Sequence, residues 1–253
     1  MSSSTSRNAV ILDYRTSDYE RTKLEDMGIR TVESERIDTL YSAVDGHPDL
    51  QFIRYNDQLI CHGEISQLKL EELNKIHPAI QKGRSQLVLP YPRHIGLNAL
   101  ITPDLFIHKL EATDPFLLEL LKSDKNRAAV HTNQGYTRCS CAYVGKDSFV
   151  TEDVSLAKLL KGLGKSVFYA EHSNVCLRGF DYGFIGGALS LLTVRNTPLL
   201  IISGEISRYR YGDELREFLM KENIPYECIG KGLLMDRGSI IEIHENLGNQ
   251  EQY

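Results

Sequence analysis

The sequence lacks the features that would assign it at once to several large classes of protein. Among its 253 residues, no apolar run approaches the roughly 20 residues that a transmembrane helix needs. Residues 1–6 are polar and contain no apolar core typical of a signal peptide. No GxxxxGK[ST] motif is present, which excludes a P-loop, and the glycine run at residues 183–187 is not a GxGxxG motif. The net charge of -5 argues against a surface dedicated to nucleic acid or membrane.

Cysteine is scarce, and its spacing is not that of a metal site. The five cysteines are an odd number, and neither a CxxC pair nor a His-x-His pair occurs. We therefore expect free thiols in a reducing, cytoplasmic compartment and no bound metal. Cys139 and Cys141 form a CxC pair, which on a strand would place both sulfurs on one face. Two small buried residues, a reactive thiol or a metal-ligand pair would each fit this spacing.

What the sequence does contain is a repeated pattern of two strands, a helix and a strand. In residues 135–170, a polar lead-in precedes a strand, a turn at Gly145-Lys146, a second strand, an apolar helix ended by Gly164, and a last strand. The pattern recurs about every 45 residues. In the first unit it predicts a helix through Ile80 and a last strand over residues 86–89. The five units span residues 45–90, 91–132, 133–171, 177–229, and 230–243 together with 8–33.

The two ends of the chain complement one another. The N-terminal part is one strand short of a unit, and the C-terminal part ends with a lead-in and a single strand over residues 239–243. If this strand pairs with residues 8–13, the ends complete the fifth unit and close a ring. The sequence therefore predicts an α/β fold, a five-bladed ββαβ propeller. We expect one domain over residues 8–245, with a flexible arm at 1–7 and a tail at 246–253. A doubly wound fold is disfavoured because two strands precede each helix.

Five ββαβ units closed by their termini resemble the pentein fold, the α/β-propeller of the guanidino-group-modifying enzymes. Locally, Cys141-Ala142-Tyr143-Val144-Gly145 with Phe149-Val150 resembles a strand pair of the dimethylarginine dimethylaminohydrolases. The segment Ile185-Gly186-Gly187-Ala188-Leu189 is similar to the Asp-Gly-Gly-Asp module of that superfamily. The superfamily also includes deiminases, amidinotransferases and a non-catalytic ribosome anti-association factor. The resemblance implies a cysteine nucleophile, a histidine acid/base and carboxylates that hold a guanidinium, without metal or cofactor.

This chain departs from the pentein pattern at three places. Ile185 and Ala188 stand where acids should flank the glycine pair, and Tyr136 stands where a module should begin with histidine. The last unit begins with Asp236-Arg237-Gly238 in place of a His-Cys pair. The sequence therefore predicts a divergent member of the superfamily.

The repeat also predicts where a site should lie. In an antiparallel hairpin, the start of the first strand and the end of the second lie at the same end. Five lead-ins and five exit loops should therefore meet on one face of the ring, where a ligand would bind. Among the lead-ins, His47-Pro48-Asp49 predicts a general acid/base beside an orienting carboxylate. The alternative is a turn in which Asp49 caps local N–H groups.

The lead-in of the third unit supplies a candidate nucleophile. Arg138 precedes Cys139, and a neighbouring cation lowers the pKa of a thiol. The alternative is a strand-edge arginine covering a buried cysteine, and Cys61 beside His62 is a second cysteine candidate. The glycines of residues 183–187 indicate close approach of the backbone, either to a ligand or to packing at the ring centre.

Together these patterns predict a cysteine-dependent, metal-independent hydrolase or transferase acting on a small guanidine, amidine or related C–N substrate. Cys139 would be the nucleophile, His47 the acid/base and Asp49 a carboxylate for the cation. The alternatives are a catalytically silent binding protein and a biosynthetic enzyme with other chemistry, such as cyclisation. We expect no cofactor, no nucleic-acid or membrane partner, and a homodimer as one option. The expected substrate contacts are Asp13, Arg15, Glu64, Asn98, Tyr136, Arg138, Gly186, Gly187, Glu205 and Asp236.

Overall fold

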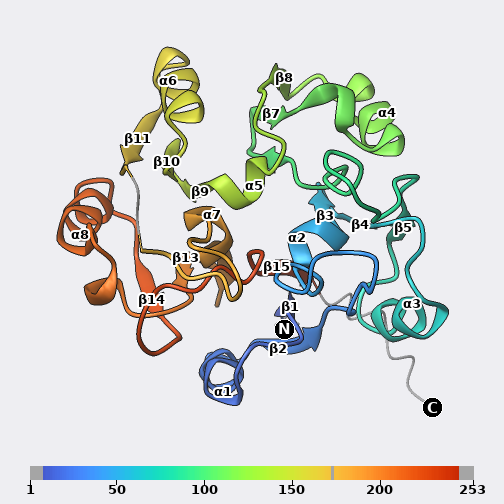
Figure 1. The fold of residues 1–253 in the computed structure, drawn as a ribbon, viewed down its shortest axis with the longest axis horizontal. Coiled ribbons are helices and arrows are strands. Elements are labelled where there is room, and N and C mark those ends of the chain that lie inside the picture. Colours follow the sequence, from blue (N-terminus) through green and yellow to red (C-terminus); the bar gives the residue numbers. More distant parts are fainter. Residues whose placement is uncertain (1–7, 172–173, 245–253) are drawn as a thin grey trace, which may run out of the picture.

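The computed structural model describes residues 8–171 and 174–244. The predicted arm at 1–7 and tail at 246–253 lie outside the described residues. Within the described part, five three-stranded sheets stand around a common centre (Figure 1). None of the described helices is long and apolar enough to cross a membrane.

Each sheet comes from one predicted unit and has the same topology. The second strand lies in the middle, antiparallel to the first and parallel to the last. From the first unit to the fifth, the strands are β3 (Phe52–Tyr55), β4 (Gln58–Cys61) and β5 (Ile80–Lys82); β6 (Leu100–Ile101), β7 (Leu105–His108) and β8 (Ala128–His131); β9 (Cys141–Gly145), β10 (Ser148–Thr151) and β11 (Ser166–Tyr169); β12 (Leu189–Val194), β13 (Thr197–Ile202) and β14 (Tyr226–Cys228); and β15 (Ile241–His244), β1 (Asn8–Leu12) and β2 (Arg30–Glu33).

A helix connects the second and last strands of every unit. Most of these helices begin at a side-chain cap, such as Asp153, whose carboxylate accepts from the N–H groups of Ser155 and Leu156. Buried residues one turn apart, such as Leu156 and Leu160, hold the helix on its sheet. The connecting helices are α1 (Asp18–Asp26), α3 (Gln67–Asn74), α4 (Pro115–Ser123), α6 (Val154–Gly162) and α8 (Gly212–Lys221); short helices are α2 (Pro48–Gln51), α5 (Thr137–Ser140), α7 (Ile185–Ala188), η1 (Leu110–Ala112) and η2 (Ile206–Arg208).

The fifth sheet closes the ring from both ends of the described chain. Strand β15 pairs antiparallel with β1, from Asn8 opposite His244 to Ile11 opposite Ile241. In Figure 1 the blue β1 and the red β15 accordingly lie side by side. This pairing confirms the predicted closure, and it makes β1 the middle strand of its sheet in place of an open edge.

The apolar core is divided among the junctions between neighbouring sheets. Each junction has its own cluster of buried side chains, so every unit is stabilised by the units on both sides. A fully buried side chain such as that of Phe149 contributes roughly 1.5–3 kcal/mol by its removal from water. Around the ring the clusters include Ile53 with Leu97, Leu100 with Phe149, Val150 with Leu189, Leu192 with Leu12, and Ile241 with Phe52.

Two local predictions are wrong. Helix α3 ends at Asn74, and the last strand of the first unit is β5, not residues 86–89. Pro78 explains the difference, because it cannot continue a helix and favours extended backbone before it. Cys139 lies in the one-turn helix α5, whereas Cys141 begins β9, so the two cysteines do not share one face of a strand.

Candidate active site

The lead-ins of the first three units meet at the centre of the ring through Asn98. Its Oδ1 accepts hydrogen bonds from the backbone N–H groups of Arg138 (3.0 Å) and Cys139 (3.3 Å). Its Nδ2 donates to the backbone carbonyl of Asp49 (3.2 Å) and lies 3.3 Å from Cys139 Sγ. Asn98 was predicted to contact the substrate. The structure places it behind the thiol, where it is fully buried and holds two lead-ins together.

The remaining lead-ins close this chain of contacts. A Cβ on Gly186 would lie 2.5 Å from the Cys139 carbonyl oxygen, so only glycine permits this approach of the fourth unit to the third. Ser239 Oγ, from the fifth unit, lies 3.0 Å from the Gly186 carbonyl oxygen and 3.3 Å from Asp49 Oδ2, so its single proton is shared between these two acceptors. The Asp49 N–H donates to the Gly238 carbonyl (3.0 Å), which links the fifth unit to the first. The predicted packing role of the glycine pair is thus seen at Gly186.

Cys139, His47 and Asp49 lie together at this centre. The sulfur, an imidazole nitrogen and a carboxylate oxygen are all within 4.8 Å of one another. The Cys139 thiol donates to Asp49 Oδ2 at 2.9 Å. All three side chains are buried, and neither ring nitrogen of His47 makes a hydrogen bond in the described structure. The lead-ins of two separate units therefore bring together the three residues that the sequence marked as catalytic.

The surroundings favour an uncharged thiol. Burial raises the pKa of Cys139 well above its usual value, and the nearby carboxylates of Asp49 and Asp236 raise it further. Burial also lowers the pKa of His47 and raises the pKa of Asp49. The sequence predicted a lowered pKa for the Cys139 thiol because Arg138 precedes it. That prediction is wrong, because burial and the two carboxylates raise the pKa by more than a neighbouring cation could lower it. A positively charged ligand placed beside Cys139 would instead favour the thiolate.

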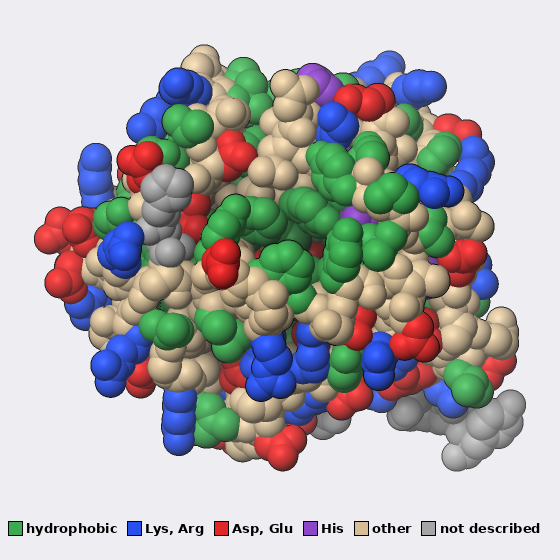
Figure 2. Space-filling model, viewed as in Figure 1, with side chains coloured by type: hydrophobic (Ala, Val, Ile, Leu, Met, Phe, Trp, Pro, Cys, Tyr) green, Lys and Arg blue, Asp and Glu red, His purple; other side chains and the backbone are tan. Residues whose placement is uncertain are grey.

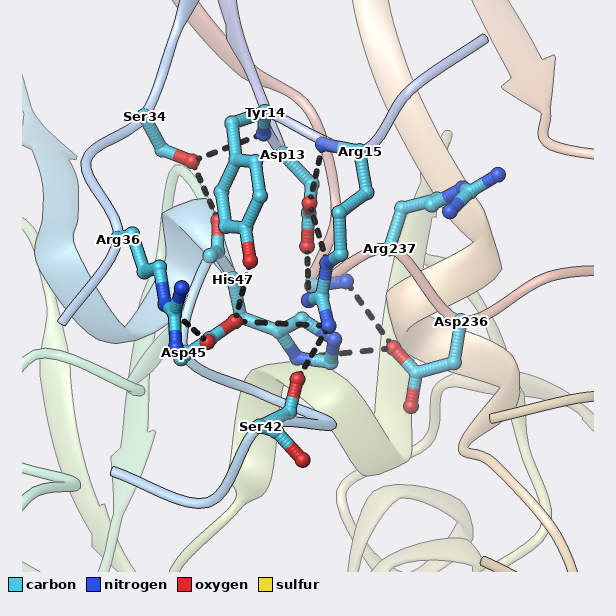
Figure 3. A network of polar contacts seen from close by, with 12 residues as sticks. Asp13, Tyr14, Arg15, Ser34, Arg36, Ser42, Asp45, His47, Asp236 and Arg237 are labelled. Atoms are coloured by element: carbon cyan, nitrogen blue, oxygen red, sulfur yellow. Dashed lines mark hydrogen bonds and ion pairs between the residues drawn. The ribbon is translucent and has the colours of Figure 1, made fainter. Parts of the chain in front are cut away.

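Asp236 is the second carboxylate of the site. Its Oδ1 lies 3.9 Å from His47 Nδ1. A dashed line in Figure 3 marks this contact. The backbone N–H groups of Phe184 (2.9 Å) and Gly238 (3.0 Å) donate to its two oxygens and fix its orientation. A Cβ on Gly187 would lie 2.6 Å from Asp236 Cγ, so this glycine makes room for the carboxylate.

Asp13 and Arg15 form an internal network beside His47. Arg15 donates to Asp13 through Nε (2.8 Å) and to the Ser42 carbonyl through Nη1 (2.6 Å), and it lies 3.5 Å from Asp45 (Figure 3). Asp13 is buried. The predicted substrate contacts Asp13 and Arg15 thus pair with each other, and they supply charge near the imidazole without lining the pocket.

A pocket of about 280 Å³ opens onto Cys139, His47 and Asp236. Three of its aromatic side chains are largely exposed, with exposed fractions of 49% for Tyr41, 55% for Phe180 and 62% for Tyr182. Figure 2 shows hydrophobic side chains gathered around a hollow near the middle of the face seen in Figure 1. The other lining residues are Val44, Leu50, Tyr136, Leu177, Asp181 and Phe184. The site therefore combines a polar floor with mostly apolar walls.

The other predicted site residues lie in different parts of the structure. Tyr136 lines the pocket, and its hydroxyl lies 2.6 Å from His94 Nε2. Glu64 is exposed and accepts from Gln86, and Glu205 lies 3.6 Å from Arg208. Neither glutamate lines the pocket, so we assign them no contact with a substrate. Arg138 lines a different cavity.

The second cysteine candidate does not join this pocket. Cys61 and His62 are buried, and burial raises the pKa of Cys61 to about 11 and lowers that of His62 to about 4. The reasoning from sequence missed six of the residues that line the pocket, Tyr41, Val44, Leu50, Leu177, Phe180 and Phe184. The aromatic spacing of Phe180, Tyr182 and Phe184 within one lead-in was the available signal.

A family model described as a family of unknown function (DUF6873) matches residues 11–241. The chain belongs to this family. A comparison with curated proteins found no match.

Several solved structures are similar over almost the whole chain. DDAH from Pseudomonas aeruginosa, a cysteine-to-serine mutant complexed with citrulline, is 8% identical with a TM-score of 0.54, over 94% of this chain and 98% of that chain. A dimethylarginine dimethylaminohydrolase adduct with S-methyl-L-thiocitrulline is 10% identical with a TM-score of 0.52, over 88% and 91%. An inosamine-phosphate amidinotransferase from Streptomyces griseus is 11% identical with a TM-score of 0.51, over 92% and 80%. These similarities confirm the predicted pentein fold.

Proposed function

We propose that this protein is a cysteine-dependent enzyme that breaks a C–N bond of an amidine or guanidine, as a hydrolase or a transferase. The main support is that Cys139, His47 and Asp49 lie within 4.8 Å of one another. Two of them, with Asp236, form the floor of a pocket large enough for a small molecule. A silent binding protein would have no need for a buried thiol, imidazole and carboxylate at the same point.

The proposed reaction begins with a neutral thiol and neutral imidazole. The positive charge of the substrate's amidinium or guanidinium group favours the thiolate form of Cys139. His47 accepts the proton that leaves Cys139. The thiolate attacks the sp² carbon and a C–S bond forms. The C–N bond then breaks, and the amine leaves with the proton held by His47. Water, or an acceptor amine, attacks the same carbon with His47 as base; the C–S bond breaks and the thiol is restored.

The two carboxylates have different proposed roles. Asp236 faces the pocket with His47 and would pair with an N–H group of the cation. Asp49 lies behind the thiol, where it accepts a hydrogen bond from the thiol and orients the sulfur. Because the pocket floor is negative and buried, it favours a cation over a neutral substrate of the same shape.

The walls indicate what the cation is attached to. Tyr41, Phe180 and Tyr182 surround the pocket with aromatic surface, and none of the described residues that line it is a lysine or an arginine. A substrate with its own carboxylate would find no cationic partner in this pocket. We therefore propose an amidine or guanidine carried on an aromatic or otherwise apolar body, which stacks on these rings.

A selective alkylation experiment tests the nucleophile. The protein is treated briefly with 2-chloroacetamidine, a cation, or with its neutral analogue 2-chloroacetamide, and adducts are located by mass spectrometry. Cys139 should be labelled preferentially by the amidine, relative to the half-buried thiol Cys228. Benzamidine should protect Cys139, and neutral benzamide should not.

Variants separate catalysis from binding. Cys139→Ala should abolish ammonia release from benzamidine or phenylguanidine, whereas the control Cys228→Ala should retain it. Tyr182→Ala should weaken protection by benzamidine while leaving the Cys139 thiol reactive. If both reagents label all thiols slowly and without preference, the proposal fails and the silent binding protein is favoured.

A further inference from the structure

A second cavity, of about 620 Å³, lies on the other side of the ring centre. The first strand of every unit contributes to its wall, and so do the hairpin turns at Asn56-Asp57 and Thr102-Pro103. The candidate active site lies at the lead-in end of these strands, so the two cavities occupy opposite ends. The strand residues that line the second cavity are Phe52, Ile53, Arg54, Ile101, Tyr143, Leu191, Ile241 and Glu242.

Arg138 brings an unpaired positive charge to this second cavity. Its guanidinium makes no hydrogen bond or ion pair with the described residues, and its Nε is buried without a partner. The other two arginines of the wall are paired: Arg54 lies 3.2 Å from Glu242, and Arg127 lies 2.6 Å from Asp124. Arg138 is half-buried, and its buried Nε without a partner is costly; an anion that supplied an acceptor to it from the cavity would reduce that cost.

Arg138 also connects the cavity to the candidate active site. It precedes Cys139 in α5, and its backbone N–H is fixed by Asn98. Asp49 lines the second cavity and accepts from Cys139 Sγ, which faces the first. The charge on Arg138 lowers the pKa of Asp49 against the effect of burial. Any group that neutralises Arg138 therefore acts on the carboxylate behind the thiol.

We propose that the second cavity is a binding site for a small organic carboxylate, with Arg138 as its ionic anchor. The planar guanidinium suits a carboxylate, which it can bind through two parallel hydrogen bonds. The apolar wall residues, among them Ile101, Tyr143 and Leu191, would contact the body of the ligand. This site is independent of the proposed catalytic function, although occupation of it would alter the charge beside Asp49.

Calorimetric titration with sodium benzoate at constant ionic strength tests the site, with benzamide as the neutral probe. Benzoate should bind and benzamide should not. Arg138→Met removes the charge and keeps much of the volume, and it should weaken benzoate binding about tenfold or more. The control Arg195→Met removes an exposed charge from the β12–β13 turn and should leave the affinity unchanged.

A second variant keeps the test decisive if Arg138→Met does not fold. Leu191→Phe narrows the cavity without touching Arg138 and should also weaken benzoate binding, with melting temperatures checked for every variant. Loss of binding in both folded variants supports the site. Equal affinity in wild type and Arg138→Met overturns it, as does an absence of binding to wild type. If Arg138→Met does not fold, unchanged binding by Leu191→Phe overturns the proposal instead.

Discussion

The buried carboxylate of Asp49 permits a test that needs no substrate. Its Oδ2 accepts from Cys139 Sγ (2.9 Å) and Ser239 Oγ (3.3 Å), while its Oδ1 is buried without a partner. In Asp49→Asn the amide oxygen can replace Oδ2 and the amide nitrogen can replace Oδ1. Both hydrogen bonds are then kept and a buried negative charge is removed. We expect the variant to be more stable than wild type near neutral pH, and to lose activity.

The size of this gain depends on pH in a defined direction. Burial raises the pKa of Asp49 above its ordinary 3.8, so the folded protein holds this proton more tightly than the unfolded chain does. Ionisation therefore costs stability, by about 1.4 kcal/mol for each unit by which the folded pKa exceeds the unfolded one. The gain from Asp49→Asn should be absent below the ordinary pKa. It should grow as the pH rises, and level off above the folded pKa.

Urea unfolding followed by circular dichroism from pH 5 to pH 8 measures this gain. Asp124→Asn is a matched control, because hydrogen bonds from the Asn126 N–H, Tyr55 and Arg127 lower the pKa of Asp124. That variant should lose stability, which is the opposite sign, and the loss should stay constant from pH 5 to pH 8, because the pKa of Asp124 lies below 3.8 in the folded protein and the carboxylate is ionised throughout this range. An Asp49→Asn variant less stable than wild type at pH 7, or a gain independent of pH, would refute the reasoning.

Three further predictions concern the ring centre and the thiol. Gly186→Ala should lower the free energy of unfolding, measured in urea, by roughly 1–3 kcal/mol, because the new Cβ would lie 2.5 Å from the Cys139 carbonyl oxygen. The control Gly162→Ala in α6 has no neighbour within 4 Å of the new Cβ and should be neutral or stabilising. Equal effects of the two substitutions would contradict this prediction. Alkylation of Cys139 by neutral 2-chloroacetamide should keep rising to pH 9 and beyond, because the pKa of the thiol is raised above 9.0; a plateau near neutral pH would disprove that. A chelator should leave turnover unchanged while Zn²⁺ inhibits it, because Cys139, His47 and Asp49 offer zinc ligands; turnover that requires a metal would disprove the assigned roles.

The repeat was predictable because its signals are local. Glycine and asparagine mark the hairpin turns, where Lys146 and Asn196 have left-handed backbone, and side-chain caps mark the helices. The wrong strand in the first unit had a signal too, since Pro78 lies inside the helix that was predicted to run through Ile80. Ring closure was predictable for a different reason: each end of the chain lacked the part that the other supplied.

The sequence marked three residues that the structure brings together, but it predicted neither the raised pKa of the thiol nor the apolar pocket walls. His47, Asp49 and Cys139 were marked by residue type and by their place in the lead-ins, and closure of the ring brings them together. The short helices α2 and α5 have too few residues to show a helical period, so Cys139 was assigned to a strand. The raised pKa of its thiol depends on burial and on Asp236, which is far away in sequence. The apolar pocket walls come from loops, which carry no periodic pattern.

The pairing of β15 with β1 makes the order of the five sheets circular. In the other units a short turn joins the first strand to the second, whereas in the fifth unit these two strands come from opposite ends of the described chain, with Asn8 opposite His244. A circular permutant that joins these strands by a tight turn and opens the chain at Asn196 would keep all five sheets. It would also keep every lead-in intact. Opening the chain at the corresponding turn of another unit would place the new termini at that unit, where they could serve as attachment points without disturbing the centre.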